Sequence, residues 1–162
     1  MKFIDLFSGI GGFHLGIEQA TDDRWECVWA CDNNKYATKV YNQHFADRKG
    51  AERYKPTDIR TVSSGDIPEH DLICAGFPCQ SFSVAGRRQG FADTRGTLFF
   101  EICRIAKDHA TPYLLLENVK GLLNHAGGRT FGTILSSLDE LGYRVQWGVL
   151  NSKNFGVLQN RE

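Results

Sequence analysis

The sequence predicts an α/β fold in which a mostly parallel sheet is flanked by helices. Short apolar runs alternate with amphipathic stretches along the chain, which is the pattern of successive βαβ units. Glycine-rich or polar residues directly follow several of the apolar runs, and such folds bind ligands at the carboxyl ends of parallel strands. The chain has 162 residues with no internal repeat or linker, so we predict one domain over residues 1–162.

The first half of the chain contains two clear strand–helix pairs. Short apolar segments at residues 3–6 and 26–31 predict strands. Each is followed by an amphipathic stretch that predicts a helix, at residues 13–20 and 35–45. A weaker third strand is expected near residues 53–55.

The second half repeats this alternation around one long loop. Apolar segments that predict strands lie at residues 71–75 and 113–116, and stretches that predict helices lie at residues 97–109 and 131–141. A glycine-rich loop is expected over residues 76–96. Residues 143–150 alternate between apolar and polar side chains, which predicts a strand at one edge of the sheet.

The composition is typical of a soluble globular protein, with 41% apolar and 23% charged residues. No apolar run approaches the roughly 18 residues of a membrane span, and the acid at Asp5 is atypical of a signal peptide. We therefore expect a cytoplasmic protein with no membrane partner. The 19 basic residues only balance the 19 acidic ones. This argues mildly against DNA binding by this chain alone, because DNA-binding proteins usually carry a basic stripe.

The five cysteines form neither a disulfide pattern nor a metal pattern. No C-x-x-C pair occurs and no two histidines have zinc-ligand spacing, so we expect no metal. Four are expected to be buried free thiols, namely Cys27, Cys31, Cys74 and Cys103. The fifth, Cys79, stands at the corner where a predicted strand enters the long loop. A partly exposed cysteine at the ligand-binding edge of a sheet is a candidate nucleophile.

The loop that follows Cys79 has the composition of a mobile lid. It contains Arg87 and Arg88 among glycines and small residues, and side chains of this kind contact phosphates. The alternative is a solvated surface loop, although a loop of this length without a function is uncommon.

Glu117 and Asn118 follow the predicted strand at residues 113–116. An acid directly after an apolar run is costly to bury unless it is paired or protonated. Glu117 is therefore a candidate to protonate or hydrogen-bond a base that Cys79 attacks. The alternative is that Glu117 caps the turn at residues 119–121.

The segment at residues 7–12 follows the first predicted strand and opens a helix. Its glycines allow a tight turn and a close approach of a ligand to the backbone. A dinucleotide fingerprint would have a further glycine at position 14, which is His14 here. A simple strand–helix turn therefore remains an alternative.

Two aspartates follow predicted strands and could contact the same ligand as the glycine-rich turn. Asp32 ends the second predicted strand, where nucleotide-binding folds position an acid to reach ribose hydroxyls. Asp58 is expected to end the third strand and to accept a hydrogen bond from an adenine amino group. For both residues the alternative role is a cap or a turn.

Four segments together resemble the bacterial cytosine-5 DNA methyltransferases. They lie at residues 5–12, 76–96, 117–119 and 159–162, in the order found in that family. The resemblance implies a Rossmann-like methyltransferase fold that uses S-adenosylmethionine. It also implies a role in a restriction-modification system, with duplex DNA as the substrate.

The resemblance assigns roles to individual residues. It implies that Cys79 adds to carbon 6 of a cytosine flipped out of the duplex. Glu117 would hold and protonate nitrogen 3 of that base, and Arg161 would orient the base or the loop of Cys79. The residues expected to bind the cofactor are Phe7, Ser8, Gly9, Gly11, Gly12, Asp32, Asn33, Asp58, Ile59 and Pro78.

The resemblance stops at Glu162. The family pattern continues with a second arginine, a region that reads the DNA sequence and elements that close the cofactor pocket. We therefore expect the fold to be incomplete at the C-terminus, to need a complementary C-terminal segment or subunit, and to methylate DNA negligibly alone. Asn33 also replaces a bulky apolar residue that often packs on the adenine in this family.

Other functions remain open from the sequence. A tRNA cytosine-5 methyltransferase would share the thiol mechanism. A nicotinamide-dependent oxidoreductase would use the glycine-rich turn and Asp32, but it would leave Cys79 and Glu117 without a role. A cysteine hydrolase would need a histidine near Cys79, and none stands at an obvious strand end. A non-enzymatic remnant is the remaining alternative.

Overall fold

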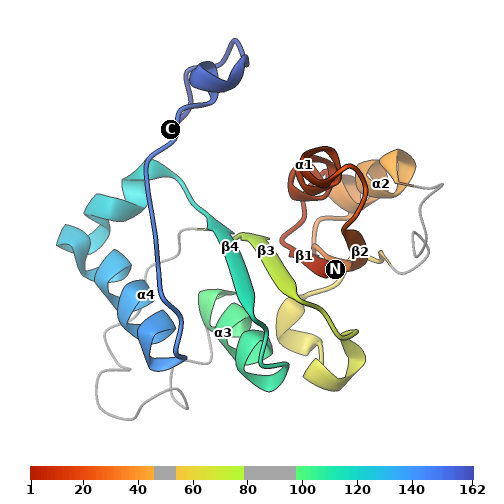
Figure 1. Ribbon diagram of the computed structural model, residues 1–162, viewed down its shortest axis with the longest axis horizontal. Coiled ribbons are helices and arrows are strands. Elements are labelled where there is room, and N and C mark those ends of the chain that lie inside the picture. Colours follow the sequence, from red (N-terminus) through yellow and green to blue (C-terminus); the bar gives the residue numbers. More distant parts are fainter. Residues whose placement is uncertain (46–53, 79–97) are drawn as a thin grey trace.

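A four-stranded, wholly parallel sheet forms the centre of the molecule (Figure 1). The computed structural model describes residues 1–45, 54–78 and 98–162. The strands are β1 (Lys2–Leu6), β2 (Glu26–Cys31), β3 (Leu72–Gly76) and β4 (Tyr113–Glu117), in the order β2-β1-β3-β4. The chain runs outward from β1 in both directions, so the switch in topology lies between β1 and β3. The expectation of a parallel α/β fold is confirmed.

In the described ranges, four α-helices cover the two faces of the sheet. They are α1 (Gly12–Thr21), α2 (Lys35–His44), α3 (Leu98–Asp108) and α4 (Arg129–Glu140). Figure 1 shows α1 and α2 together beside β1 and β2, and α3 and α4 on the other side. All four helices were predicted, with ends that differ by two residues or fewer.

The core has two layers because side chains alternate across a strand. Phe3 and Cys74 face a layer that includes Tyr41 and Phe45 of α2 and its C-terminal cap. The neighbouring residues, such as Ile4, face the larger layer below α3 and α4. Strands buried on both faces read as continuous apolar runs, which explains why they were found from the sequence.

Two predicted strands are wrong in the described part of the chain. Near the predicted strand at 53–55, the structure has only an isolated parallel bridge between Asp32 and Pro56. Residues 143–150 form no strand, and Trp147 and Leu150 are 61% and 70% exposed. An alternating pattern makes a strand only when a partner strand supplies hydrogen bonds, and no described segment lies in that position.

The described connections contain short 3-10 helices, which are η2 (Ile59–Thr61), η3 (Ser64–Asp66), η6 (Lys120–Gly128) and η7 (Ser152–Phe155). The helical backbone of η6 is interrupted at residues 125–127. Most of the predicted long loop, including Arg87 and Arg88, lies outside the described residues. None of the helices in residues 1–45, 54–78 and 98–162 is both long and apolar enough to cross a membrane.

Candidate active site

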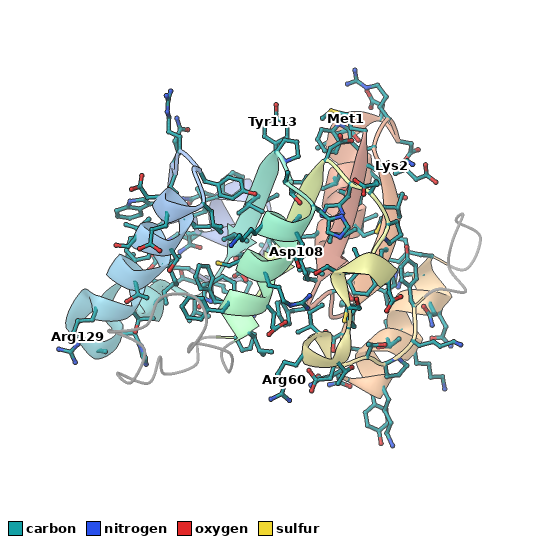
Figure 2. The ribbon with its side chains drawn as sticks, turned by 90° about the horizontal axis from the view of Figure 1, so that it is seen from below. Met1, Lys2, Arg60, Asp108, Tyr113 and Arg129 are labelled. Atoms are coloured by element: carbon teal, nitrogen blue, oxygen red, sulfur yellow. The ribbon has the colours of Figure 1, made fainter. Side chains whose placement is uncertain are left out.

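The carboxyl ends of all four strands point to the same edge of the sheet. Figure 2 shows Met1 and Tyr113 at the amino end of the sheet and Arg60 toward the opposite end. The residues that follow the strands at this opposite edge are Phe7, Asp32, Phe77 and Asn118. Two of the sequence-predicted site residues, Phe7 and Asp32, therefore lie at the edge of the sheet where ligands bind in such folds.

The glycine-rich turn after β1 has an unusual backbone. Phe7, Gly9 and Gly11 have φ angles of 56°, 55° and 94°, in the left-handed region that bulky residues rarely occupy. The turn is anchored by hydrogen bonds from Ser8 N to Cys31 O (3.1 Å) and from Gly11 N to Ser8 O (2.8 Å). A non-glycine residue held in this conformation is a feature typical of ligand-binding sites.

The glycines of the turn differ in what surrounds them. A Cβ atom added to Gly11 would lie 2.3 Å from Cε2 of Phe45, so this glycine allows the turn to pack against the end of α2. A Cβ atom added to Gly9 or Gly12 would meet nothing within 4 Å. Gly11 thus serves the packing, while the backbone at Gly9 and Gly12 is open to a ligand.

Asp32 ties the turn to the end of β2. Its Oδ2 accepts a hydrogen bond from Gly9 N (2.8 Å), and its Oδ1 accepts one from Asn34 N (2.7 Å). The side chain that caps α2 is that of Asn34, which accepts from the backbone of Tyr36 and Ala37. The interpretation of Asp32 as the helix cap is therefore wrong. Each carboxylate oxygen retains acceptor capacity for a hydroxyl group.

Asp58 and Ile59 lie beyond the end of β2. The carboxylate of Asp58 caps η2 by accepting from Arg60 N (3.0 Å) and also pairs with the Arg60 guanidinium, with Nη2 2.6 Å from Oδ2. These hydrogen bonds lower the pKa of Asp58 below its ordinary value. The side chain of Ile59 is buried in the core. The capping role of Asp58 is confirmed, whereas its role toward an adenine stays a prediction.

Glu117 lies beside the point where β3 ends. Gly76 and Glu117 are the last paired residues of β3 and β4. A Cβ atom added to Gly76 would lie 3.4 Å from Oε2 of Glu117, so the carboxyl group rests over the backbone of Gly76. The helix η6 starts at Lys120, and its N-cap residue Val119 is joined by no side-chain cap, so the interpretation of Glu117 as a cap is wrong.

Four other candidate residues have fewer described contacts or lie outside the described ranges. Pro78 is exposed at the end of a described range, Asn33 is exposed after β2, and Cys79 lies outside the described residues. Arg161 is exposed in the C-terminal segment, which an ion pair between Glu162 and Lys120 joins to the start of η6.

The four cysteines predicted to be structural are buried free thiols, as expected. Burial raises the pKa of each of these thiols, Cys27, Cys31, Cys74 and Cys103, above the ordinary value, so they are unreactive near neutral pH. In the described ranges no group of three or more acidic, histidine or cysteine side chains could hold a metal ion.

The sequence analysis named two further polar residues of this region, Asn118 and Asp5, but assigned them no role in the site. The amide of Asn118 donates a hydrogen bond to Phe77 O at 2.7 Å, which no local pattern reveals. Asp5 is fully buried in β1, and neither of its carboxylate oxygens has a hydrogen-bond partner with good geometry. Burial raises the pKa of Asp5 to about 8 despite the nearby backbone N–H of His14. The available signal for Asp5 was an acid inside an apolar strand.

Comparisons with known proteins agree over the whole chain. The sequence profile described as "C-5 cytosine-specific DNA methylase" matches residues 1–162. The chain is 47% identical over 161 residues to the type II methyltransferase M1.ScrFI of Lactococcus lactis subsp. cremoris, covering 99% of this chain and 39% of that protein. It is 48% identical over 161 residues to the type II methyltransferase M.NlaX of Neisseria lactamica, covering 99% of this chain and 50% of that protein.

A solved structure gives the same answer for the fold. The S. pombe Dnmt2 methyltransferase superimposes with a TM-score of 0.75 and 27% sequence identity, covering 99% of this chain and 48% of that one. The similarity confirms the Rossmann-like methyltransferase fold that the resemblance implied. The chain spans half or less of the length of these three proteins.

Proposed function

Because this chain belongs to the C-5 cytosine-specific DNA methylase family, we propose that it is the catalytic and cofactor-binding domain of a DNA (cytosine-5-)-methyltransferase. The domain covers residues 1–162 and modifies cytosine within a specific duplex sequence, as part of a restriction-modification system. The observation that carries the proposal is the position of the Glu117 carboxyl group over Gly76, three residues before Cys79. This arrangement brings an acid next to the segment that contains the candidate nucleophile.

The proposed reaction uses both groups on one flipped cytosine. The Cys79 thiolate forms a bond to carbon 6, and the displaced ring electrons are accommodated at nitrogen 3, where Glu117 supplies a proton. Carbon 5 thereby becomes nucleophilic and takes the methyl group. Loss of the proton from carbon 5 and release of the thiolate then restore the aromatic ring, while Arg161 orients the base or the loop of Cys79.

S-adenosylmethionine, when bound, would supply the methyl group from its positively charged sulfonium and leave as the neutral thioether S-adenosylhomocysteine. The residues present fit such a ligand, because the backbone at Gly9 and Gly12 is open where a Cβ atom would stand and Asp32 retains acceptor capacity for ribose hydroxyls. The proposed cofactor residues are Phe7, Ser8, Gly9, Gly11, Gly12, Asp32, Asn33, Asp58, Ile59 and Pro78. Asp58 would accept from the adenine amino group while remaining beside Arg60.

The proposed partners are duplex DNA with a flipped cytosine and a complementary C-terminal segment or subunit, without a metal. The segment is expected at β4, whose outer edge borders a hollow of about 550 Å³ that also contacts residues 142–150. Leu115, Trp147 and Val149 expose apolar surface there, at 43%, 61% and 45%. Exposed apolar strand edges in parallel sheets are normally covered. We propose the cytoplasm, where bacterial DNA lies, as the compartment.

Calorimetric titration with S-adenosylmethionine tests the cofactor half of the proposal. We expect binding that is weakened by Asp58→Ala but not by Asp66→Ala, a matched change of an exposed acid in η3. If binding appears only after the C-terminal part of a relative is added, the pocket needs that part for closure. A completed protein that binds nicotinamide dinucleotide instead would overturn the proposal.

Methyl transfer by the completed protein tests the substrate. We expect transfer from S-adenosylmethionine to cytosine in duplex DNA, loss of transfer with Cys79→Ser, and negligible transfer by the 162-residue chain alone. Transfer to tRNA in place of duplex DNA would assign the alternative substrate. Full activity of Cys79→Ser would remove the thiol from the mechanism.

A further inference from the structure

We propose that Asn118 is a positioning residue that holds the start of the nucleophile segment at a defined place beside Glu117. The inference rests on the proposed function, because it assigns Asn118 a role in the reaction of Cys79 and Glu117. Its basis is the hydrogen bond that the Asn118 amide donates to the main-chain carbonyl of Phe77, with Nδ2 and O 2.7 Å apart. This bond joins two segments 41 residues apart in the sequence.

The bond lies where the backbone pairing of the two strands ends. The last registered pair of β3 and β4 is Gly76 with Glu117. Beyond that pair, the segment after β3 continues to Phe77 and Pro78, and the segment after β4 continues to Asn118. The Asn118 side chain therefore takes the place of the next rung of the ladder, and it does so immediately after the residue that supplies the candidate acid.

At neutral pH, where a carboxyl group is ionised, the amide satisfies both contacts of this side chain. The carbonyl of Phe77 accepts and does not donate, so it requires the NH₂ group. The Val119 N–H donates to Oδ1 at 3.0 Å, so this second contact requires an acceptor on the side chain. An ionised carboxylate would keep the second contact and lose the first, and an aliphatic side chain would lose both.

The Phe77 residue, whose carbonyl accepts this hydrogen bond, is itself fixed by the packing of its side chain. The Phe77 ring is 5% exposed and its centroid lies 5.5 Å from that of Phe99. The following Pro78 has a fixed φ angle and no N–H group, which leaves few ways to reorient the peptide that leads to Cys79. The Asn118 contact thus controls the remaining freedom of the Phe77–Pro78 peptide plane.

Orientation of this kind affects the chemical step more than binding. A displacement of about 1 Å between reacting groups can cost about 100-fold in rate. Asn118 has no proposed contact with the cofactor or with the DNA backbone. Losing its donor should therefore lower kcat and leave the affinities for S-adenosylmethionine and DNA largely unchanged.

The test uses this chain completed by the C-terminal part of a relative, and it requires that the wild-type protein methylates duplex DNA. A wild-type protein without transfer contradicts the proposed function, whereas the variants judge the role of Asn118. Asn118→Asp removes the NH₂ donor and keeps Oδ1. Asn42→Asp is the matched control, because the Asn42 amide also donates to a main-chain carbonyl, that of Tyr54, at 2.8 Å, but lies in α2.

We expect Asn118→Asp to lower kcat by about 100-fold while KM for DNA and the dissociation constant for S-adenosylmethionine change by less than about threefold. Asn42→Asp should lose comparable stability without this fall in kcat. The ratio of variant to wild-type kcat should rise as the pH falls, because the introduced carboxyl group, once protonated, donates to Phe77 O again.

An equal effect of the two substitutions on kcat would reduce Asn118 to a structural role and overturn the proposal. A loss of activity that came entirely from weaker DNA or cofactor binding would overturn it too. A constant activity ratio across the pH range would show that the donor to Phe77 O is not what matters.

Discussion

Strands β1 and β4 belong to the same parallel sheet but have different surroundings. β1 is paired on both edges, with β2 and β3, and its residues Phe3, Ile4 and Leu6 are completely buried. β4 is paired only with β3 among the described residues, and Tyr113 and Leu115 are 57% and 43% exposed. Among the described residues β1 is therefore an interior strand, whereas β4 is an edge strand whose outer edge can still accept a partner strand.

The polar contacts of the two regions differ in the same way. Beside β1, the buried His14 Nδ1 lies 2.7 Å from the Tyr41 hydroxyl, and its ring stacks on Phe45 at 3.8 Å between centroids. Beyond β4, the ion pair of Lys120 with Glu162 is exposed, and the segment around η7 extends away from the sheet (Figure 1). Buried polar networks specify one geometry, whereas exposed ion pairs add little stability. We infer that the glycine-rich turn is held rigidly and that the β4 side opens at lower free energy.

The largest expected effect is at Gly11. Gly11→Ala would place Cβ 2.3 Å from the Phe45 ring at a φ angle of 94°, so we expect the free energy of unfolding to fall by about 3 kcal/mol or more. Urea denaturation followed by circular dichroism measures this loss. Gly12→Ala, which has open space around it, should change stability by less than about 1 kcal/mol. Equal losses for the two variants would refute the argument that close packing dictates Gly11.

A second, smaller effect concerns the buried acid of β1. Burial raises the pKa of Asp5 from 3.8 to about 8, so the folded state binds a proton that the unfolded state releases between these pH values. The stability contributed by this proton is complete below pH 4 and is lost as the pH rises toward 8, with a slope of up to about 1.4 kcal/mol per pH unit.

Asp5→Asn tests this linkage. We expect the variant to lack the fall in stability between pH 4 and 8, and to exceed the wild-type protein at pH 8 by about 2 kcal/mol. The gain is below the full linkage value because the buried amide also lacks partners. Urea titrations at several pH values provide the comparison. Parallel stability curves for the two proteins would contradict the raised pKa.

A third effect should appear at Asp32, which links the turn to α2. Asp32→Asn replaces one acceptor oxygen by an NH₂ group near a backbone N–H that needs an acceptor, and we expect a loss of about 1–2 kcal/mol. Asp66→Asn is the exposed control and should cost less than about 0.5 kcal/mol. Urea denaturation measures the free energy of unfolding of both variants relative to the wild-type protein. Similar values would mean that the contacts of Asp32 with Gly9 and Asn34 do not stabilise the turn.

The smallest effect is expected on the β4 side. Leu115→Ser removes a side chain that is 43% exposed, so the chain alone should lose less than about 0.5 kcal/mol. The same substitution should weaken association with the C-terminal part of a relative, measured by calorimetry. Lys107→Ser, on the far end of α3, should leave that association unchanged. A large loss in the isolated chain would show that this edge is already covered.

Local sequence patterns were sufficient for most of the fold. Strands β1, β2 and β3 are largely buried on both faces, and they therefore appear in the sequence as short apolar runs. Strand β4 has the same apolar sequence although alternate residues are exposed. The helices were also recognisable from the sequence, because each must bury one face and its apolar residues therefore recur at helical spacing. The glycine-rich turn and the strand-end acids were visible because backbone conformation and strand position limit which residues can stand there.

The candidate site was less completely predicted, because its contacts join distant segments. Nothing near Asn118 in the sequence shows that its amide reaches Phe77 O, which lies 41 residues away. The residues around Asp32 in the sequence likewise do not show that its carboxylate accepts from Gly9 N. Nor do they show that Asn34, and not Asp32, caps α2.

By itself, then, the sequence determined the alternation of strands and helices, the turn at Gly9 and Gly11, and the family, since these depend on local conformation and on short motifs. Tertiary structure decided that residues 143–150 are not a strand, that Asp5 is buried without partners, and that Glu117 lies over Gly76. Each of these depends on what neighbouring elements supply. Hydrogen bonds, burial and steric room are properties of a pair of segments, and a single segment of sequence does not contain its partner.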